Sequence, residues 1–303
     1  MAVMPNLYEL AARATGRAMS ALSRRAPAPR RTFSDLPADT RDITVPTRHG
    51  QVRCTVYRPS GASASTPVYV NVHGGGFVIR LPEQDDAWCR YLMTHADVVV
   101  LNVDYDTAPQ HPFPISVEQV HDVVVWASDP AREWDGSRPG IGGQSAGGSL
   151  SAAVARMVRD AGGPTLALQI LHYPVLDMVT PPGRKPGGQH SKVPPPWMSR
   201  VFGLCYAPDS ATRKNPLVSP AWGPNSENLA GMAPAVVVTA EHDALRDEAV
   251  RYARALEGAG VLREHHDVPG VDHGYDIQDR TPLTTERVYS LLAEHVRRVV
   301  QQS

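Results

Sequence analysis

The feature that most constrains the fold is an alternation of short strand-like runs with longer segments of helical spacing. Strands are predicted at 52–57, 67–72, 97–103, 139–143, 167–172, 235–239 and 263–268, and helices at 116–128, 146–159, 247–257 and 285–300. Several strand-like runs are continuously apolar and β-branched, as strands buried on both faces are. The alternation predicts an α/β fold with a mostly parallel central sheet and helices on both faces. In such sheets, functional residues lie just past the carboxyl ends of the strands.

The composition is that of an ordinary globular protein and indicates no macromolecular partner. Of the 303 residues, 42% are hydrophobic and 20% are charged, and the formal net charge is -1. This balance gives no electrostatic basis for binding nucleic acid. No apolar run reaches the roughly 18 residues of a membrane-spanning helix. Cys54, Cys89 and Cys205 are far apart without a C-x-x-C pair, which predicts no disulfide framework, no zinc site and a cytoplasmic location.

An amphipathic helix is predicted near the N-terminus, in a segment that lacks the compact apolar region of a signal peptide. Its apolar residues recur at helical spacing and are Leu7, Leu10, Ala11, Ala14, Ala18 and Leu22. Such a helix either packs over the domain or lies on a membrane surface. Because the stripe is mostly alanine, we expect the helix to pack. Proline-rich stretches at 26–46 and 180–196 are predicted to be irregular.

The run Gly143-Gln144-Ser145-Ala146-Gly147 matches G-x-S-x-G, a strand-to-helix turn that exposes a serine hydroxyl. A serine hydroxyl is a weak nucleophile that needs a neighbouring base. The alternative is a glycine-rich helix start that binds phosphate or only turns the chain. A Walker loop is excluded because no Gly-Lys-Ser/Thr follows, and G-x-G-x-x-G fails because Ser145 occupies its last position. The motif therefore makes Ser145 the candidate nucleophile.

A second motif, His73-Gly74-Gly75-Gly76-Phe77, directly follows the predicted strand 67–72. Three consecutive glycines cost conformational entropy, so a connecting loop gains little from them unless the backbone must adopt an unusual conformation. They allow a ligand to approach bare backbone N–H groups, which a nucleophilic serine needs to stabilise an oxyanion. We expect His73 to orient this loop by hydrogen bonds.

The acid that would orient a catalytic histidine is sought after the predicted strand 235–239. The carboxylates there are Glu241, Asp243, Asp247 and Glu248. Asp243 falls in the turn between strand and helix, where a side chain can reach across the end of the sheet. Asp247 and Glu248 begin the next helix, where an acidic side chain favours the N-terminal dipole. Asp243 is therefore the candidate acid.

The base is sought among the histidines that follow Asp243. They are His265 and His266 within a predicted strand, His295 within the last helix, and His273 in the loop 269–274. Only His273 follows the carboxyl end of a strand. The chain order Ser145, Asp243, His273 is the order in which hydrolases of this architecture carry their triad.

Together these motifs resemble those of the hormone-sensitive-lipase-like esterases, the bacterial family IV branch of the α/β-hydrolase superfamily. The resemblance extends from about residue 50 to residue 300. Besides the motifs above, it rests on Val103-Asp104-Tyr105, Ala108-Pro109, Pro112-Phe113-Pro114, Tyr173-Pro174 with Asp177, residues 215–220, Asp243 to Glu248, and His273-Gly274.

The resemblance implies an activity and a set of roles. Ser145 would be the nucleophile, His273 the base and Asp243 its orienting acid, with the N–H groups of Gly75, Gly76 and Ala146 as the oxyanion hole. Ester hydrolysis would proceed through an acyl-enzyme on short- to medium-chain esters, without a metal or organic cofactor. The partner would be a small-molecule ester, and a homodimer could form through the edge at 263–268.

The resemblance also implies a division of the chain. Residues 1–45 and 178–215 would form two cap segments, and 46–177 with 216–303 would form the α/β-hydrolase core. Three positions depart from the family pattern. Gln144 stands where the family has Asp or Thr, Arg80 where it often has Gly, and Asp106 where it has Arg.

Two alternatives remain open at this level. The same triad could cleave amides or thioesters, which only substrates can distinguish. The fold could also serve a non-catalytic binding protein, as in plant gibberellin receptors, although such proteins tend to lose the triad histidine and His273 is present.

Overall fold

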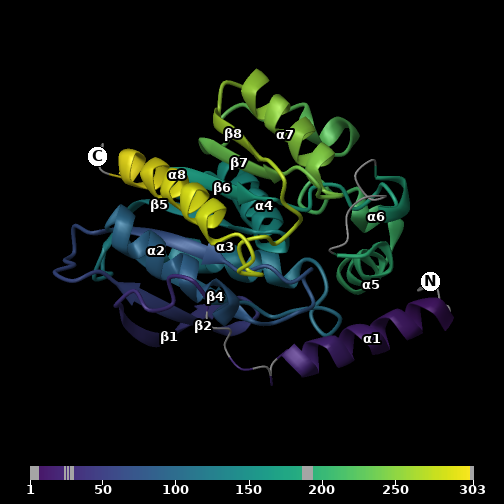
Figure 1. Ribbon diagram of the computed structural model, residues 1–303, viewed down its shortest axis with the longest axis horizontal. Helices are drawn as coiled ribbons and strands as arrows, with labels where there is room; N and C mark the ends of the chain where they lie inside the picture. Colours follow the sequence, from purple (N-terminus) through teal and green to yellow (C-terminus); the bar gives the residue numbers. More distant parts are fainter. Residues whose placement is uncertain (1–6, 24, 26, 28–30, 186–193, 301–303) are drawn as a thin grey trace.

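An eight-stranded sheet forms the centre of the computed structural model, which describes residues 7–23, 25, 27, 31–185 and 194–300. The strands are β1 (Asp39–Thr47), β2 (Gly50–Arg58), β3 (Pro67–Val72), β4 (Val99–Asp104), β5 (Asp135–Gln144), β6 (Leu168–His172), β7 (Ala235–Ala240) and β8 (Leu262–Val268). Their order across the sheet is β1-β2-β4-β3-β5-β6-β7-β8 (Figure 1). β2 pairs antiparallel with β1 and β4, and the other neighbours are parallel. The prediction of a mostly parallel sheet is confirmed.

Strand β1 corrects the expectation that residues 26–46 are irregular. It pairs with β2 from Asp39 to Thr47 at the edge of the sheet. Among its residues only Val45 is buried, so the apolar alternation that would have predicted a strand is weak. The strand lies mostly within the segment 1–45 that we expected to be part of the cap, yet its pairing makes it a strand of the central sheet.

Helices cover both faces of the sheet (Figure 1). One face carries α3 (Ile115–Ala127), α4 (Ala146–Ala161) and α7 (Arg246–Gly258), and the other carries α2 (Asp86–Ala96) and α8 (Pro282–Val300). Side chains of a strand point alternately to the two faces. Accordingly, Val70 and Leu101 join one apolar cluster, whereas Tyr69 and Val100 join the other.

The helices α2, α5 (Pro196–Tyr206) and α6 (Ser210–Arg213) are not among those predicted. Helix α5 begins at the last residue of the proline-rich stretch 180–196 that we expected to be irregular. Its first residue is Pro196, and proline is well tolerated in the first turn because those N–H groups have no intrahelical partner. The prolines therefore start a helix here. Residues 186–193 of the expected second cap segment lie outside the described residues.

The N-terminal helix α1 (Leu7–Ser23) packs against α5 at one side of the molecule, apart from the sheet (Figure 1). Its buried residues are Ala12, Gly16 and Ser20. A Cβ atom on Gly16 would lie 2.6 Å from Cys205 Sγ on α5, so the close approach requires glycine. The predicted helix is confirmed, but the apolar stripe that we expected to pack faces solvent. The small side chains pack instead, because only they allow α1 to approach α5 this closely.

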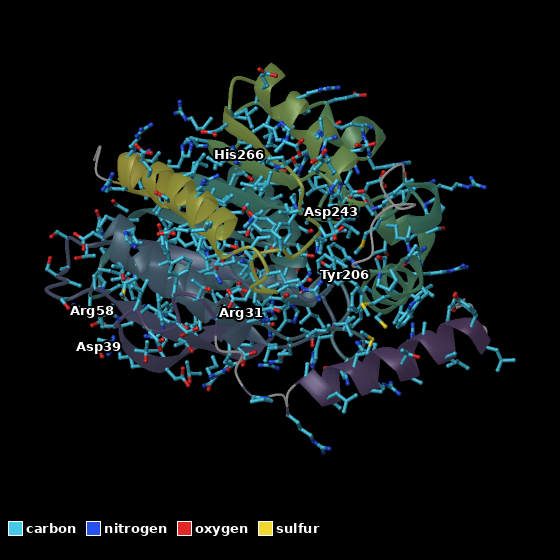
Figure 2. All side chains as sticks on the ribbon, viewed as in Figure 1. Arg31, Asp39, Arg58, Tyr206, Asp243 and His266 are labelled. Carbon is cyan, nitrogen blue, oxygen red and sulfur yellow. The ribbon has the colours of Figure 1, made fainter. Side chains whose placement is uncertain are left out.

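The site lies between the core and these added helices. Asp243 and Tyr206 lie toward that side in Figure 2, whereas Asp39 and Arg58, at the ends of β1 and β2, lie at the opposite edge. Tyr206 Oη and its ring are fully enclosed, and the ring stacks on Phe77 of the glycine loop with centroids 4.0 Å apart. Helix α5 thus covers the loop that follows β3.

Candidate active site

Ser145 lies at a strained turn between β5 and α4. Its backbone has φ 54° and ψ -116°, a conformation that non-glycine residues rarely adopt and that is found at functional sites. The turn is held by the Ser145 N–H, which donates to the carbonyl of His172 at 2.9 Å. A Cβ atom on Gly143 or Gly147 would lie within 2.0 Å of the Val72 carbonyl oxygen. The glycines of the motif are therefore required by the close contact between α4 and β3.

The structure brings Ser145, His273 and Asp243 into one hydrogen-bonded line. His273 Nε2 lies 2.9 Å from Ser145 Oγ, and His273 Nδ1 lies 2.7 Å from Asp243 Oδ2. Asp243 is 1% exposed, and its other oxygen accepts the Leu245 N–H at 2.9 Å. The buried carboxylate thus fixes the orientation of the imidazole ring, and water does not reach the carboxylate. This arrangement can remove the hydroxyl proton and hold the charge that results.

The other candidate acids and bases lie elsewhere. Asp247 is on the outer side of α7 beside Arg246, and Glu248 is buried against Lys185. His265 bonds Thr239 on the sheet edge, and His295 bonds Glu264. None of these side chains forms a hydrogen bond with Ser145, whereas His273 lies within hydrogen-bond distance of it.

The glycine loop after β3 lies beside Ser145. Gly75 and Gly76 have φ angles of 117° and 60°, and a Cβ atom on Gly76 would overlap the Phe202 ring at 2.1 Å. Among the described residues, the N–H groups of Gly75 and Gly76 donate to no protein oxygen. Ala146 is the first residue of α4, where backbone N–H groups lack intrahelical partners. Donors are therefore free next to the hydroxyl.

His73 has the orienting position that we expected. It is fully buried, its Nδ1 lies 2.6 Å from the Gly74 carbonyl oxygen, and its ring stacks on Tyr105 at 4.3 Å. Burial lowers the pKa of His73 to about 4, so the imidazole is neutral near pH 7 and can donate one hydrogen bond to the loop.

Gln144 has a partner that the sequence did not reveal. Its Nε2 donates to Asp276 Oδ2 at 2.6 Å, and the hydroxyls of Tyr173 and Tyr289 also donate to this carboxylate. Asp276 is 2% exposed. The Tyr173 ring meets His273 edge-on, with centroids 4.8 Å apart. Asp276 therefore links the residue before the nucleophile to the ring that supports the base, and only its place three residues after His273 could have suggested this.

The other two departures from the family pattern form an ion pair with each other. Arg80 Nη1 donates to Asp106 Oδ1 at 2.7 Å, and Arg80 Nε donates to Asp104 Oδ1 at 2.5 Å. Burial opposes ionisation of Asp104, but its hydrogen bonds and charge contacts with Arg80 and Arg53 prevail and lower its pKa. The reversed charge at position 106 is thus compensated within the fold.

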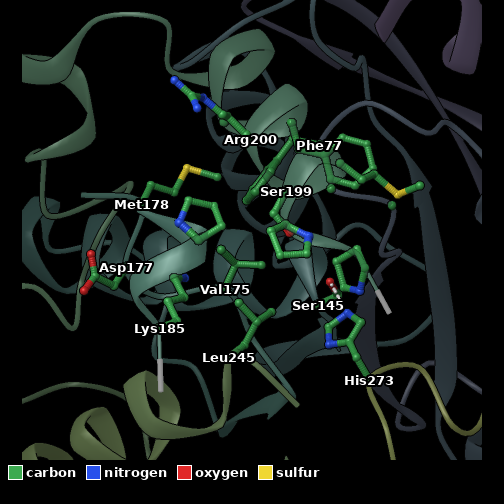
Figure 3. Close-up of a pocket in the computed structure, with 18 of the residues that line it drawn as sticks. Phe77, Ser145, Val175, Asp177, Met178, Lys185, Ser199, Arg200, Leu245 and His273 are labelled. Carbon is green, nitrogen blue, oxygen red and sulfur yellow. Dashed lines mark hydrogen bonds between the residues drawn. The ribbon is translucent and has the colours of Figure 1, made fainter. Parts of the chain in front are cut away.

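A cavity of about 680 Å³ opens at Ser145 and His273 (Figure 3). This volume is in the range of small-molecule sites. Its walls are mostly apolar and include Phe77, Val175, Met178, Phe202, Leu245 and Ile277. Figure 3 shows Ser145 and His273 at one end of the cavity and Asp177 and Lys185 at the other. The reacting groups therefore face an open cavity lined by the strand ends and by α1 and α5.

Two kinds of site are absent from the described part of the chain. No three histidine, cysteine or acidic side chains gather there as a group that could hold a metal ion. Within the same residues, no helix is both long and apolar enough to cross a membrane. All three cysteines are buried and free.

Comparisons with known proteins identify the family. Residues 69–277 match the family described as the alpha/beta hydrolase fold. The chain belongs to the α/β-hydrolase-fold family. The carboxylic ester hydrolase LipN of Mycobacterium tuberculosis is 37% identical over 278 residues, which cover 86% of this chain and 72% of that protein. The carboxylesterase NlhH of the same species is 34% identical over 228 residues, covering 73% of this chain and 70% of that protein.

Solved structures of esterases have the same fold as this chain. A hyperthermophilic esterase from the archaeon Pyrobaculum calidifontis superposes with a TM-score of 0.80 at 30% identity, over 96% of this chain and 93% of that chain. The fold and the resemblance to hormone-sensitive-lipase-like esterases are confirmed by these similarities.

Proposed function

We propose that this α/β-hydrolase cleaves carboxylic esters by way of an acyl-enzyme on Ser145. The observation that carries the proposal is the line of Ser145 Oγ, His273 and Asp243, with distances of 2.9 and 2.7 Å, at the end of a mostly apolar cavity. The relatives that share the fold are named as ester hydrolases. The protein is thus a serine hydrolase of carboxylesterase type.

In the first half-reaction Ser145 Oγ attacks the acyl carbonyl while His273 Nε2 takes the hydroxyl proton. Asp243 stabilises the imidazolium and holds its orientation. The negative charge on the carbonyl oxygen is met by the N–H groups of Gly75, Gly76 and Ala146. Each such donor is worth about 10² to 10³ in rate. His273 then protonates the leaving alcohol, and water repeats the sequence to release the acid.

The proposed substrates are esters with short to medium acyl chains. The cavity volume of about 680 Å³ and its mostly apolar walls support this range, because this volume is that of a site for a small molecule. Activated esters of increasing acyl length, assayed with the purified protein, test it. A rise in kcat/KM through medium chains and a fall beyond them is expected, and a maximum with acetyl esters alone would contradict it.

The assignment of Ser145 is tested by Ser145→Ala. We expect kcat for a short activated ester to fall by about 10⁴ or more, because removing the nucleophile leaves only the oxyanion donors and binding. Ser65→Ala, an exposed serine in the loop before β3 that does not line the cavity, is the matched control and should keep activity. A fluorophosphonate probe should label the wild-type protein and not the Ser145→Ala variant.

Retained turnover in Ser145→Ala would refute the assignment. Absent labelling of the wild type would favour a binding protein.

Four further features complete the proposal. The cap comprises α1 and the described parts of 178–215, and the core comprises the remainder. The three buried free cysteines support a cytoplasmic location. The position of β8 at the edge of the sheet supports a homodimer that forms by strand pairing there. Small-molecule esters, rather than nucleic acid, are the proposed partners.

A further inference from the structure

Helix α1 presents its apolar side to solvent and its small-residue side to the protein. The exposed side chains, which we call the outer stripe, are Leu7, Leu10, Ala11, Ala14, Ala18 and Leu22. Within the stripe, Leu7 is 86% exposed and Leu22 is 68% exposed. A helix that covers a domain normally buries its apolar stripe. The reversed orientation therefore indicates that the outer stripe contacts something other than the described part of this chain.

Exposed apolar side chains are concentrated on this part of the molecule. Large exposed hydrophobic residues in the described chain are Leu7, Tyr8, Leu10, Leu22, Val125, Trp197 and Leu283. Five of them belong to α1 and the first turn of α5. Single exposed hydrophobic residues are normal, but a concentration of them marks an interaction surface.

The charges around the outer stripe are predominantly positive. Residues 7–25 contain four arginines and a single acidic residue, Glu9. Arg17 and Arg25 are exposed, and Arg13 is half-buried. On α5, the Arg200 guanidinium lies over the Tyr8 ring, 4.7 Å from its centroid. An apolar stripe flanked by arginines is typical of helices that lie in the interface of anionic membranes.

The surface borders the cavity that opens at Ser145. Tyr8 on α1 and Trp197 and Arg200 on α5 line that cavity. Tyr8 is 55% exposed and Trp197 is 57% exposed. These aromatic side chains therefore belong both to the cavity wall and to the exposed surface. Tryptophan and tyrosine favour the boundary between lipid headgroups and acyl chains.

We propose that the outer stripe of α1 docks the protein on an anionic lipid surface, with the helix lying in the plane of the headgroups. Arginines beside the stripe would contact lipid phosphates, and the leucines would enter the acyl boundary. The docking itself does not depend on ester hydrolysis. Its consequence rests on the proposed function: the cavity would take its ester from the lipid surface.

A second copy of the chain fits the surface less well. Paired outer stripes related by a two-fold axis would bring the same arginines close together, because such an interface uses the same patch twice. With Glu9 as the single acidic residue of the segment, the repulsion has little to offset it. An anionic surface complements the charge without this penalty.

Vesicle flotation with the full chain tests the docking. We expect co-flotation with phosphatidylcholine vesicles that contain ~30% phosphatidylglycerol at low salt, about tenfold less with phosphatidylcholine alone, and release at ~0.5 M salt. Leu10→Gln/Ala14→Gln, which removes apolarity without changing charge, should weaken binding about tenfold. Arg17→Gln should weaken it about fivefold for anionic vesicles only.

The control variant is Val125→Gln/Leu283→Gln, which changes exposed hydrophobic residues on α3 and α8 and should float as the wild type does. Hydrolysis of a soluble short ester, measured in parallel, should be equal in all variants, so that loss of docking and loss of activity are separate results. The proposal is overturned if the wild type does not float, or if the stripe variant floats unchanged. It is also overturned if sedimentation shows a dimer that the stripe variant dissolves and no lipid binding.

Discussion

At the scale of single residues, the site depends on a carboxylate outside the triad. Asp276 accepts hydrogen bonds from Gln144, Tyr173 and Tyr289 while it is almost completely buried. Gln144 precedes the nucleophile, and Tyr173 supports the His273 ring. Because a misplacement of about 1 Å near reacting groups can cost about 10² in rate, we regard Asp276 as a positioning residue.

Asp276→Asn should lower kcat about ten- to hundredfold with KM changed less than about threefold. The asparagine NH₂ group cannot accept a hydrogen bond, so at least one of the donors that now bind the carboxylate would lose its acceptor. Gln144→Asp alone should also be impaired, since it places two carboxylates together. The double variant Gln144→Asp/Asp276→Asn restores a single carboxylate and should recover part of the activity. A double variant no better than the poorer single one would contradict this account, and so would Asp276→Asn with wild-type kcat.

At the scale of elements, a buried carboxyl joins a short helix to the sheet. Asp85 ends η1 (Pro82–Asp85), and its Oδ2 accepts from Asn71 Nδ2 on β3 at 2.9 Å. The same Asn71 group donates to Asn102 on β4, which in turn donates to the Pro82 carbonyl. These amides fix η1, and with it the start of α2, on the strands.

This carboxyl predicts a pH dependence of stability. Burial raises the pKa of Asp85 to about 8, whereas the unfolded value is about 3.9. Between these values the folded protein binds a proton that the unfolded chain lacks. The free energy of unfolding therefore falls as pH rises, by up to about 1.4 kcal/mol per pH unit. Asp85→Asn should remove this pH dependence. The free energy of unfolding of the variant, relative to that of the wild type, should therefore increase from about pH 5 to pH 8. Urea unfolding across that range measures it, and parallel pH curves for the two proteins would contradict it.

At the scale of the whole molecule, the segment that follows β6 is joined to α7 through a buried ion pair. Lys185, in the segment that we expected to be part of the cap, places its Nζ 2.5 Å from Glu248 Oε2 on α7. Glu248 Oε1 also accepts the N–H groups of Leu176 and Asp177. Burial raises the pKa of Glu248 even beside this lysine. The pair therefore fixes the segment around Lys185 to α7.

Lys185→Met should lower the free energy of unfolding by about 3–5 kcal/mol, because it leaves a buried carboxylate without its partner. Adding Glu248→Gln should recover a large part of this loss, since the amide oxygen can still accept from the two backbone N–H groups. Urea unfolding of the wild type, the single variant and the double variant measures the difference. If the double variant is as unstable as Lys185→Met, the unpaired charge is not the cause.

Local features of the sequence determined much of this protein. Continuous apolar runs predicted the inner strands, and the strand ends pointed to Ser145, Asp243 and His273. Both signals depend on residues that are close together in the sequence. The first is the periodicity of apolar residues along a strand, and the second is a turn whose glycines have no room for a side chain. Strand β1 was missed because a strand at the sheet edge buries only Val45.

Only the tertiary structure decided which side chains pair with one another across long stretches of the sequence. Gln144 meets Asp276 from 132 positions away, and Arg80 meets Asp106 from 26 positions away. The face of α1 that packs was also decided in three dimensions, because Gly16 fits against Cys205 where a leucine would not. Such contacts depend on shape and charge at long sequence separation, which local periodicity does not carry.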